Sequence, residues 1–249
     1  MGAALMARSH TAPRTIAILA CHRFVDLARN PAMVISALVP IVLGLMYRTS
    51  ATFGFDIGDI SAGWLSRALY ILVFEGIMGA TMFALLSLAE SHEQGSFATL
   101  SRAGVTPGEI VCAQGLAATA MTALASGVCY AALGMDAALA LPLLAVFLLT
   151  YLPLIVASLA LAQRIRTQMG ALAASLPIMV VGLLPFVALM IGVPASLIPL
   201  LPTGAFLPLC DALATGTLTA DELAIGLGTT ALWLAASGIA LAVTLKQRR

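Results

Sequence analysis

Long apolar stretches dominate the sequence, and charged residues, glycines and prolines gather in the segments between them. A helix crosses a bilayer with about 17 to 25 apolar residues. Six stretches reach that length: residues 31–47, 68–89, 110–135, 137–162, 169–193 and 223–245. They lack the alternation of a strand, and a backbone in lipid must satisfy its own hydrogen bonds. The pattern therefore predicts an all-α polytopic membrane protein with six transmembrane helices.

Composition supports the same fold class. Of the 249 residues, 61% are hydrophobic and 9% are charged, whereas a soluble domain has about 45–50% apolar and about 25% charged residues. Most of the surface of a soluble domain must face water, for which this chain has too few polar residues. No internal repeat or low-complexity linker divides the sequence. Residues 1–249 are therefore predicted to form a single transmembrane domain.

Residues 13–30, which precede the first apolar stretch, have a different pattern. On a helical wheel Ile16, Ala20, Phe24 and Leu27 fall on one arc. We assign the polar residues to the opposite arc: Arg14, His22, Arg23, Asp26, Arg29 and Asn30. This pattern predicts an amphipathic interfacial helix that lies on the inner leaflet and turns into the membrane at Asn30-Pro31. A solvated N-terminal helix is the alternative interpretation.

The connection between the fifth and sixth apolar stretches is apolar but rich in proline. Residues 194–213 contain Pro194, Pro199, Pro202 and Pro208, and a continuous helix does not tolerate that density of prolines. We therefore expect short broken or re-entrant helices near the outer surface.

The basic residues predict the orientation in the membrane. If the N-terminus is cytoplasmic, only Arg48 and Arg67 lie outside, and the other basic residues lie inside: Arg8, Arg14, Arg23, Arg29, Arg102, Arg164, Arg166, Lys246, Arg248 and Arg249. This split follows the positive-inside rule. Both termini are therefore predicted to be cytoplasmic. Alanine-, leucine- and arginine-rich usage with one lysine is typical of a GC-rich bacterial genome, so the expected location is the plasma (cytoplasmic) membrane, the inner membrane of the cell.

Several kinds of chemistry are excluded by residues that the sequence lacks. A P-loop needs Gly-x-x-x-x-Gly-Lys followed by Ser or Thr, but the only lysine, Lys246, precedes Gln247. His92-Glu93 begins a zinc-protease pattern, yet Ser96 stands at the position of its second His. A net charge of +1 offers no nucleic-acid surface. The chain is predicted to be no enzyme, to bind no cofactor or metal itself, and to have no nucleic-acid partner.

The segment between the second and third stretches carries the most distinctive pattern. Its motif residues run in the order Glu90, Glu93, Gly95-Ser96, Leu100, Thr106 and Glu109. The segment resembles the first cytoplasmic loop of the type-2 permeases of ATP-binding-cassette exporters, in which two acidic residues, Gly-Thr, a Leu, Pro-x-Ser and a further Glu follow one another. Gly104 and Gln114 depart from that pattern, because the family often has Pro and Lys there.

The residue types in this segment predict a partner-binding role even without the resemblance. Glu90 and Glu93 lie where a helix leaves the membrane, and Gly95-Ser96 offers a break and a cap. Phe97, Leu100 and Gly104 share one face of a short following helix, which we expect to form a small exposed apolar surface that invites a partner. The alternative is an ordinary interfacial loop whose Phe97 enters the lipid.

The resemblance implies that residues 91–107 are the coupling loop that docks on a separate ATPase subunit. The coupling residues that it implies are Glu90, Glu93, Gly95, Phe97, Leu100, Arg102 and Glu109. The chain is then a permease subunit of a drug-export type, paired with a second copy or a homologue. It would move a hydrophobic or amphipathic substrate (drug, lipid or peptide) outward, with ATP and Mg on the ATPase chains. An ion-gradient-driven secondary transporter and a non-transporting membrane anchor subunit are the alternatives.

Glu75 is an acidic residue inside the second stretch. A charged carboxylate at the centre of a spanning helix costs at least about 2.5 kcal/mol, so Glu75 is expected to face the bundle or a cavity. It either contacts a cationic substrate along the transport pathway or forms a hydrogen bond to a neighbouring helix. Gly76, Ala80 and Ala84 form a stripe of small residues suited to helix contact.

Overall fold

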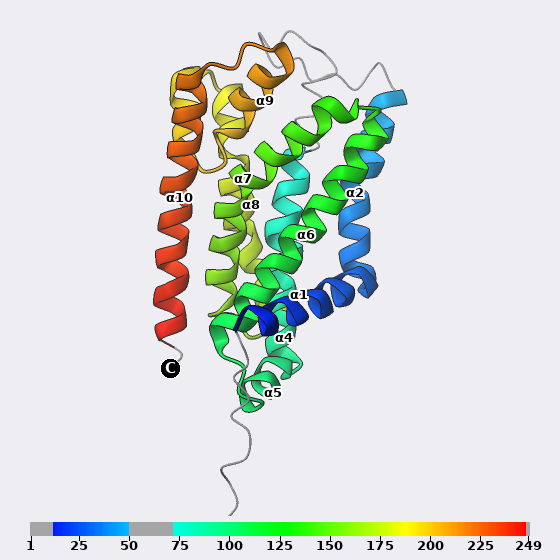
Figure 1. The fold of residues 1–249 in the computed structure, drawn as a ribbon, viewed down its shortest axis with the longest axis vertical. Helices are drawn as coiled ribbons and strands as arrows, with labels where there is room; N and C mark the ends of the chain where they lie inside the picture. Colours follow the sequence, from blue (N-terminus) through cyan, green and yellow to red (C-terminus); the bar gives the residue numbers. More distant parts are fainter. Residues whose placement is uncertain (1–11, 50–71, 248–249) are drawn as a thin grey trace, which may run out of the picture.

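The computed structural model describes residues 12–49 and 72–247, and its regular structure within these ranges is helical throughout (Figure 1). Five helical segments there are long and apolar enough to cross a membrane: Leu72–Glu93, Pro107–Leu133 (α6), Ala137–Ala162 (α7), Gln168–Met190 (α8) and Ala220–Lys246 (α10). A sixth is reached when Ala12–Arg29 (α1) and Pro31–Thr49 (α2) are counted together. The chain is thus an all-α multi-pass membrane protein, as predicted.

Five predicted spans match the five long helices to within a few residues, whereas the predicted first span, residues 31–47, is counted only together with α1. The segment Leu72–Glu93 contains the π-helix Gly79–Leu86 (η1) and α4 (Ser87–Glu93). Residues 68–71 of the predicted second span lie outside the described residues, as do several charged residues used to predict the orientation: Arg8, Arg67, Arg248 and Arg249. Most of the elements predicted to be cytoplasmic gather at one end: α1, α5 (Ser96–Arg102) and the end of α10 lie opposite α9 (Phe206–Thr215) (Figure 1).

Helix α1 lies across the bundle, and α2 stands upright after a bend of 74°. The bend falls at Asn30, whose side-chain oxygen accepts a hydrogen bond from the backbone N–H of Ala32 at 3.0 Å. On the predicted apolar arc Leu27 is buried and Ile16, Ala20 and Phe24 are partly buried. This face packs mainly against α6.

The structure corrects the placement of Arg23 on the solvent side of α1. Arg23 is half-buried on the inner face together with Leu27, although its neighbour His22 is exposed. Residues spaced by three or four positions share a helix face, so Ile16, Ala20, Arg23 and Leu27 follow one stripe. The long arginine side chain keeps its guanidinium near polar groups while its stem lies against the protein.

Short broken helices connect α8 and α10, as the prolines predicted. They are a 3₁₀-helix, Ala195–Leu200 (η2), and α9. Between them Gly204 approaches the backbone so closely that a side-chain carbon there would overlap the carbonyl of Ile198. The indole N–H of Trp233 on α10 donates to the carbonyl of Leu200 at 3.0 Å and so fastens this connection to the bundle.

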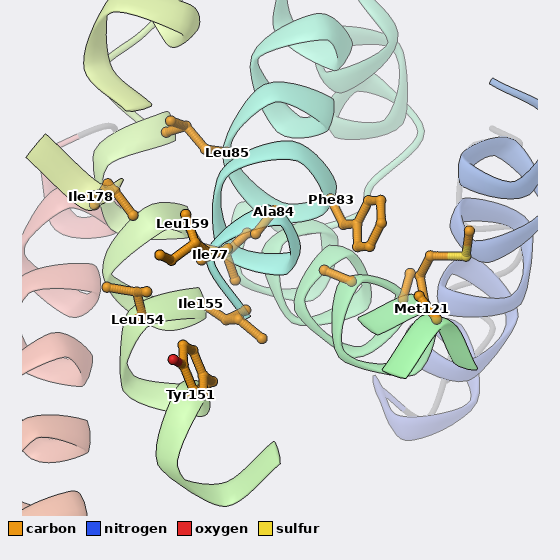
Figure 2. Close-up of a cluster of buried hydrophobic side chains, with 14 of the residues drawn as sticks. Ile77, Phe83, Ala84, Leu85, Met121, Tyr151, Leu154, Ile155, Leu159 and Ile178 are labelled. Carbon is orange, nitrogen blue, oxygen red and sulfur yellow. The ribbon is translucent and has the colours of Figure 1, made fainter. Parts of the chain in front are cut away.

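The core surrounds the segment Leu72–Glu93, which is the most enclosed of the five long helices. Within its most apolar window 72% is buried, against 22% for α8 and 17% for α10. Figure 2 shows Ile77, Ala84 and Leu85 of this segment near Tyr151, Ile155 and Leu159 of α7, with Met121 of α6 on the other side. The small-residue stripe is confirmed as a helix contact, since Ala80 and Ala84 are fully buried.

Candidate functional site

The segment that resembles a coupling loop folds as two short helices before α6. Helix α4 ends at Glu93, and α5 starts at Ser96. Gly95 separates them with a φ of 72°, a left-handed conformation that favours glycine. The hydroxyl of Ser96 donates back to the carbonyl of Ser91 at 3.1 Å. The break predicted at Gly95-Ser96 is therefore confirmed, but the predicted cap is wrong, because no side chain caps the start of α5. Helices α4 and α5 lie at one end of the bundle (Figure 1).

Glu90 is held by two side-chain amides. Asn30, at the corner between α1 and α2, donates to one carboxylate oxygen at 3.2 Å, and Gln94 donates to the other at 2.9 Å. Arg23 lies near enough to interact electrostatically with Glu90 and Asp26. Burial lowers the pKa of the Arg23 guanidinium, and the two carboxylates act in the opposite direction. Glu90 thus joins the end of α4 to the α1–α2 corner.

Glu93 makes a second long-range connection. Its carboxylate accepts a hydrogen bond of 2.7 Å from the backbone N–H of Gln168, the first residue of α8. The N-terminus of a helix carries partial positive charge and unpaired N–H groups, so a carboxylate is stabilising there. Glu90 and Glu93 therefore tie the same short stretch of chain to two elements that are distant in sequence.

Glu109 belongs to the start of α6. Its backbone N–H donates to the Thr106 hydroxyl at 3.3 Å, and its carboxylate accepts from the Thr106 backbone N–H at 2.8 Å. This is a capping box, completed by Pro107 at the first helical position. The spacing Thr-x-x-Glu is the sequence signal for this capping box.

Helix α5 does not present the exposed apolar surface that we predicted. The Phe97 side chain is only 8% exposed, and its ring centroid lies 4.4 Å from that of His92. Leu100 is partly buried against the core, whereas Arg102 and Gly104 are exposed. The helix is amphipathic and short, so its apolar side packs against its own chain. The outward side is mostly polar and consists of Thr99, Ser101 and Arg102 with the small residue Ala98.

Glu75 is fully buried in the bundle, as predicted. Neither carboxylate oxygen has a hydrogen-bond partner among the described residues, and the same holds for the hydroxyls of Ser126 and Tyr130 on α6. The next residue, Gly76, lies directly against the Tyr151 ring. The π-helix η1 begins at Gly79, one turn further along, and such segments occur frequently at functional sites. The hydrogen bond from Glu75 to a neighbouring helix, one of the two predictions for this residue, is not formed within residues 12–49 and 72–247.

Gln114 is a polar residue of α6 at the position where the exporter permeases often have Lys, and the structure gives it a packing role. It is fully buried, and its amide donates to the carbonyl of Phe83 at 2.9 Å and to the Ser87 hydroxyl at 3.0 Å.

The described residues include no group of three or more His, Cys, Asp or Glu side chains that could hold a metal ion. No family model matches the chain, and no curated protein matches it.

Proposed function

We propose that this chain is the membrane-spanning permease subunit of an ATP-binding-cassette exporter in the bacterial plasma membrane, with both termini in the cytoplasm. A separate ATPase subunit binds ATP and Mg, and a second permease copy or a homologue completes the pathway. The substrate is a hydrophobic or amphipathic molecule such as a drug, a lipid or a peptide. The chain itself is no enzyme in this proposal.

The observation that carries the proposal is the double attachment of the α4–α5 segment. Asn30 binds Glu90, and the N-terminus of α8 binds Glu93. A push on α5 would therefore reach both the α1–α2 corner and α8 through direct hydrogen bonds. Transmission of this kind moves packed helices as rigid bodies, which is how a partner's closure is converted into a change between inward- and outward-open states.

The docking surface in this proposal is the polar side of α5. Because Phe97 is buried, the ATPase meets the exposed side chains that follow it, with Arg102 as their charged member. In this proposal Leu100 packs α5 against the core, Gly95 allows the turn before α5, and Glu109 caps the start of α6.

The experiment is co-expression with the ATPase encoded beside this chain, followed by purification of the complex and measurement of ATP hydrolysis in proteoliposomes. We expect Arg102→Glu to weaken co-purification. The matched control is Arg14→Glu, an exposed arginine near the beginning of α1, which should leave co-purification intact. Failure of the wild-type chain to co-purify with any ATPase would contradict the proposal.

A secondary transporter is favoured by one observation, the buried Glu75 whose carboxylate has no partner among the described residues. Such a group suits a proton relay. Transport that stops with an uncoupler but survives ATP depletion would support this second function. A membrane anchor subunit would instead show no flux with a full complement of partners.

A further inference from the structure

A polar cavity of about 570 Å³ lies where α1, α2 and α4 meet. Small-molecule sites have volumes of about 300–1,000 Å³. Its charged and amide lining residues are Arg23, Asp26, Arg29, Asn30, Glu90 and Gln94. The cavity therefore has the size of a binding site and carries two positive and two negative groups on its wall.

These opposite charges do not neutralise one another by direct contact. The Glu90 carboxylate is hydrogen-bonded by the neutral amides of Asn30 and Gln94. Arg23 interacts with Glu90 and Asp26 only at longer range, and within residues 12–49 and 72–247 no ion pair joins the charges of this cavity. A half-buried arginine and a fixed carboxylate thus both retain the capacity to bind an ionic ligand.

The cavity lies at the corner where the chain turns into the membrane. Helix α1 exposes the apolar side chains of Ile18 and Val25, and α2 exposes Ile35, Leu38 and Val42 as it leaves the corner. Exposed apolar groups beside a charged cavity are the arrangement expected at the boundary between lipid head groups and acyl chains.

We propose that this cavity binds the head group of a zwitterionic phospholipid with a primary ammonium. Its phosphate is bound by the guanidinium groups of Arg23 and Arg29, whose planar donors match phosphate oxygens. Its ammonium donates hydrogen bonds to the carboxylates of Glu90 and Asp26. The two carboxylates disfavour a purely anionic lipid, and a quaternary ammonium has no N–H to donate. The expected order is phosphatidylethanolamine, then phosphatidylcholine, then phosphatidylglycerol.

The test uses the purified full-length chain in nanodiscs and needs no ATPase, so its outcome is separate from that of the proposed function. Native mass spectrometry counts retained lipids from mixtures of the three phospholipids. We expect Glu90→Gln to remove the preference for phosphatidylethanolamine over phosphatidylcholine, and Arg23→Gln to weaken binding of both by about tenfold, the loss of one charged hydrogen bond. Arg14→Gln is the matched control and should change neither.

A second arginine variant and a competition with a free head group complete the test. If Arg23→Gln does not fold, Arg29→Gln tests the same phosphate contact from an exposed position. Added phosphoethanolamine, a free head group, should compete only weakly, since it lacks the acyl chains. Equal retention of phosphatidylethanolamine and phosphatidylglycerol by the wild-type chain, or retention unchanged in Glu90→Gln and in both arginine variants, would overturn the proposal.

Discussion

The segment Leu72–Glu93 has glutamates in two different environments. Near its end, Glu90 accepts hydrogen bonds from Asn30 and Gln94, and Glu93 accepts one from the backbone of α8. Near its start, Glu75 is fully buried and has no hydrogen-bond partner among the described residues. Glutamates of one helix are thus hydrogen-bonded to other elements at its end, and enclosed by the bundle without such bonds elsewhere. The end of the helix is positioned by specific polar contacts, whereas the part from Glu75 to Ala84 is positioned by close packing of apolar and small residues.

The largest effect is expected near the start of this helix, where Gly76 packs against α7. A side-chain carbon added at Gly76 would overlap the Tyr151 ring, so Gly76→Ala should destabilise the protein by about 1–3 kcal/mol, the usual cost of overpacking. Thermal unfolding in detergent measures this. The control is Gly127→Ala on α6, where the added carbon meets open space. Equal stability of the two variants would contradict close packing at Gly76.

The next largest effect is expected at the polar end of the helix. Glu90→Ala removes the acceptor for both amides and separates α4 from the α1–α2 corner. A hydrogen bond to a charged group contributes about 1.5–3 kcal/mol, and partial exposure reduces this. Hydrogen exchange should show faster opening of α1 and of residues 31–34. Opening confined to α4, with α1 unchanged, would argue against the connection.

A smaller effect is expected at the cap that follows. Thr106→Ala removes the capping box of α6 and should cost about 1 kcal/mol. Thr219→Ala removes the same box from α10 and provides the matched comparison. Both variants are compared with the wild-type chain by urea or thermal unfolding. A cost at one site alone would show that the two caps are not equivalent.

The smallest effect is expected for Glu75→Gln. The carboxyl and amide groups have nearly the same shape, and the described residues offer Glu75 no hydrogen bond to lose. Unfolding should therefore be unchanged, in contrast to Glu90→Ala. A marked loss of stability would show that Glu75 has a partner. Unchanged stability with lost transport would assign Glu75 to the pathway.

The spans were predictable because lipid allows few alternatives. Apolar length and missing strand alternation sufficed for α6, α7, α8 and α10, and the prolines of residues 194–213 predicted the broken helices η2 and α9. The spacing of Arg23 from Leu27 places both residues on the same face of α1. The charge of Arg23 nevertheless led to a prediction on the opposite, polar face, which was wrong. A long charged side chain can lie on a mainly apolar helix face, so charge alone does not predict the face on which it lies.

The candidate site was predictable in its position but not in its contacts. The order of Glu90, Gly95 and Glu109 marks the segment, and Thr106 with Glu109 is a capping signal that the sequence contains. The bonds of Glu90 and Glu93 join residues 60 and 75 positions apart, which no local pattern encodes. Phe97 was predicted to be exposed, and this was wrong. Its helix is too short for the apolar pattern to show which side packs inward.

The most direct test of the proposed coupling role is photo-cross-linking within the complex with the ATPase. A photoreactive amino acid replaces Arg102 on the outer side of α5, and in a second protein it replaces Arg14 on α1. The account predicts an ATP-dependent cross-link to the ATPase from position 102 and none from position 14. An actively hydrolysing complex that gives no cross-link from position 102, or equal cross-links from both positions, would contradict it.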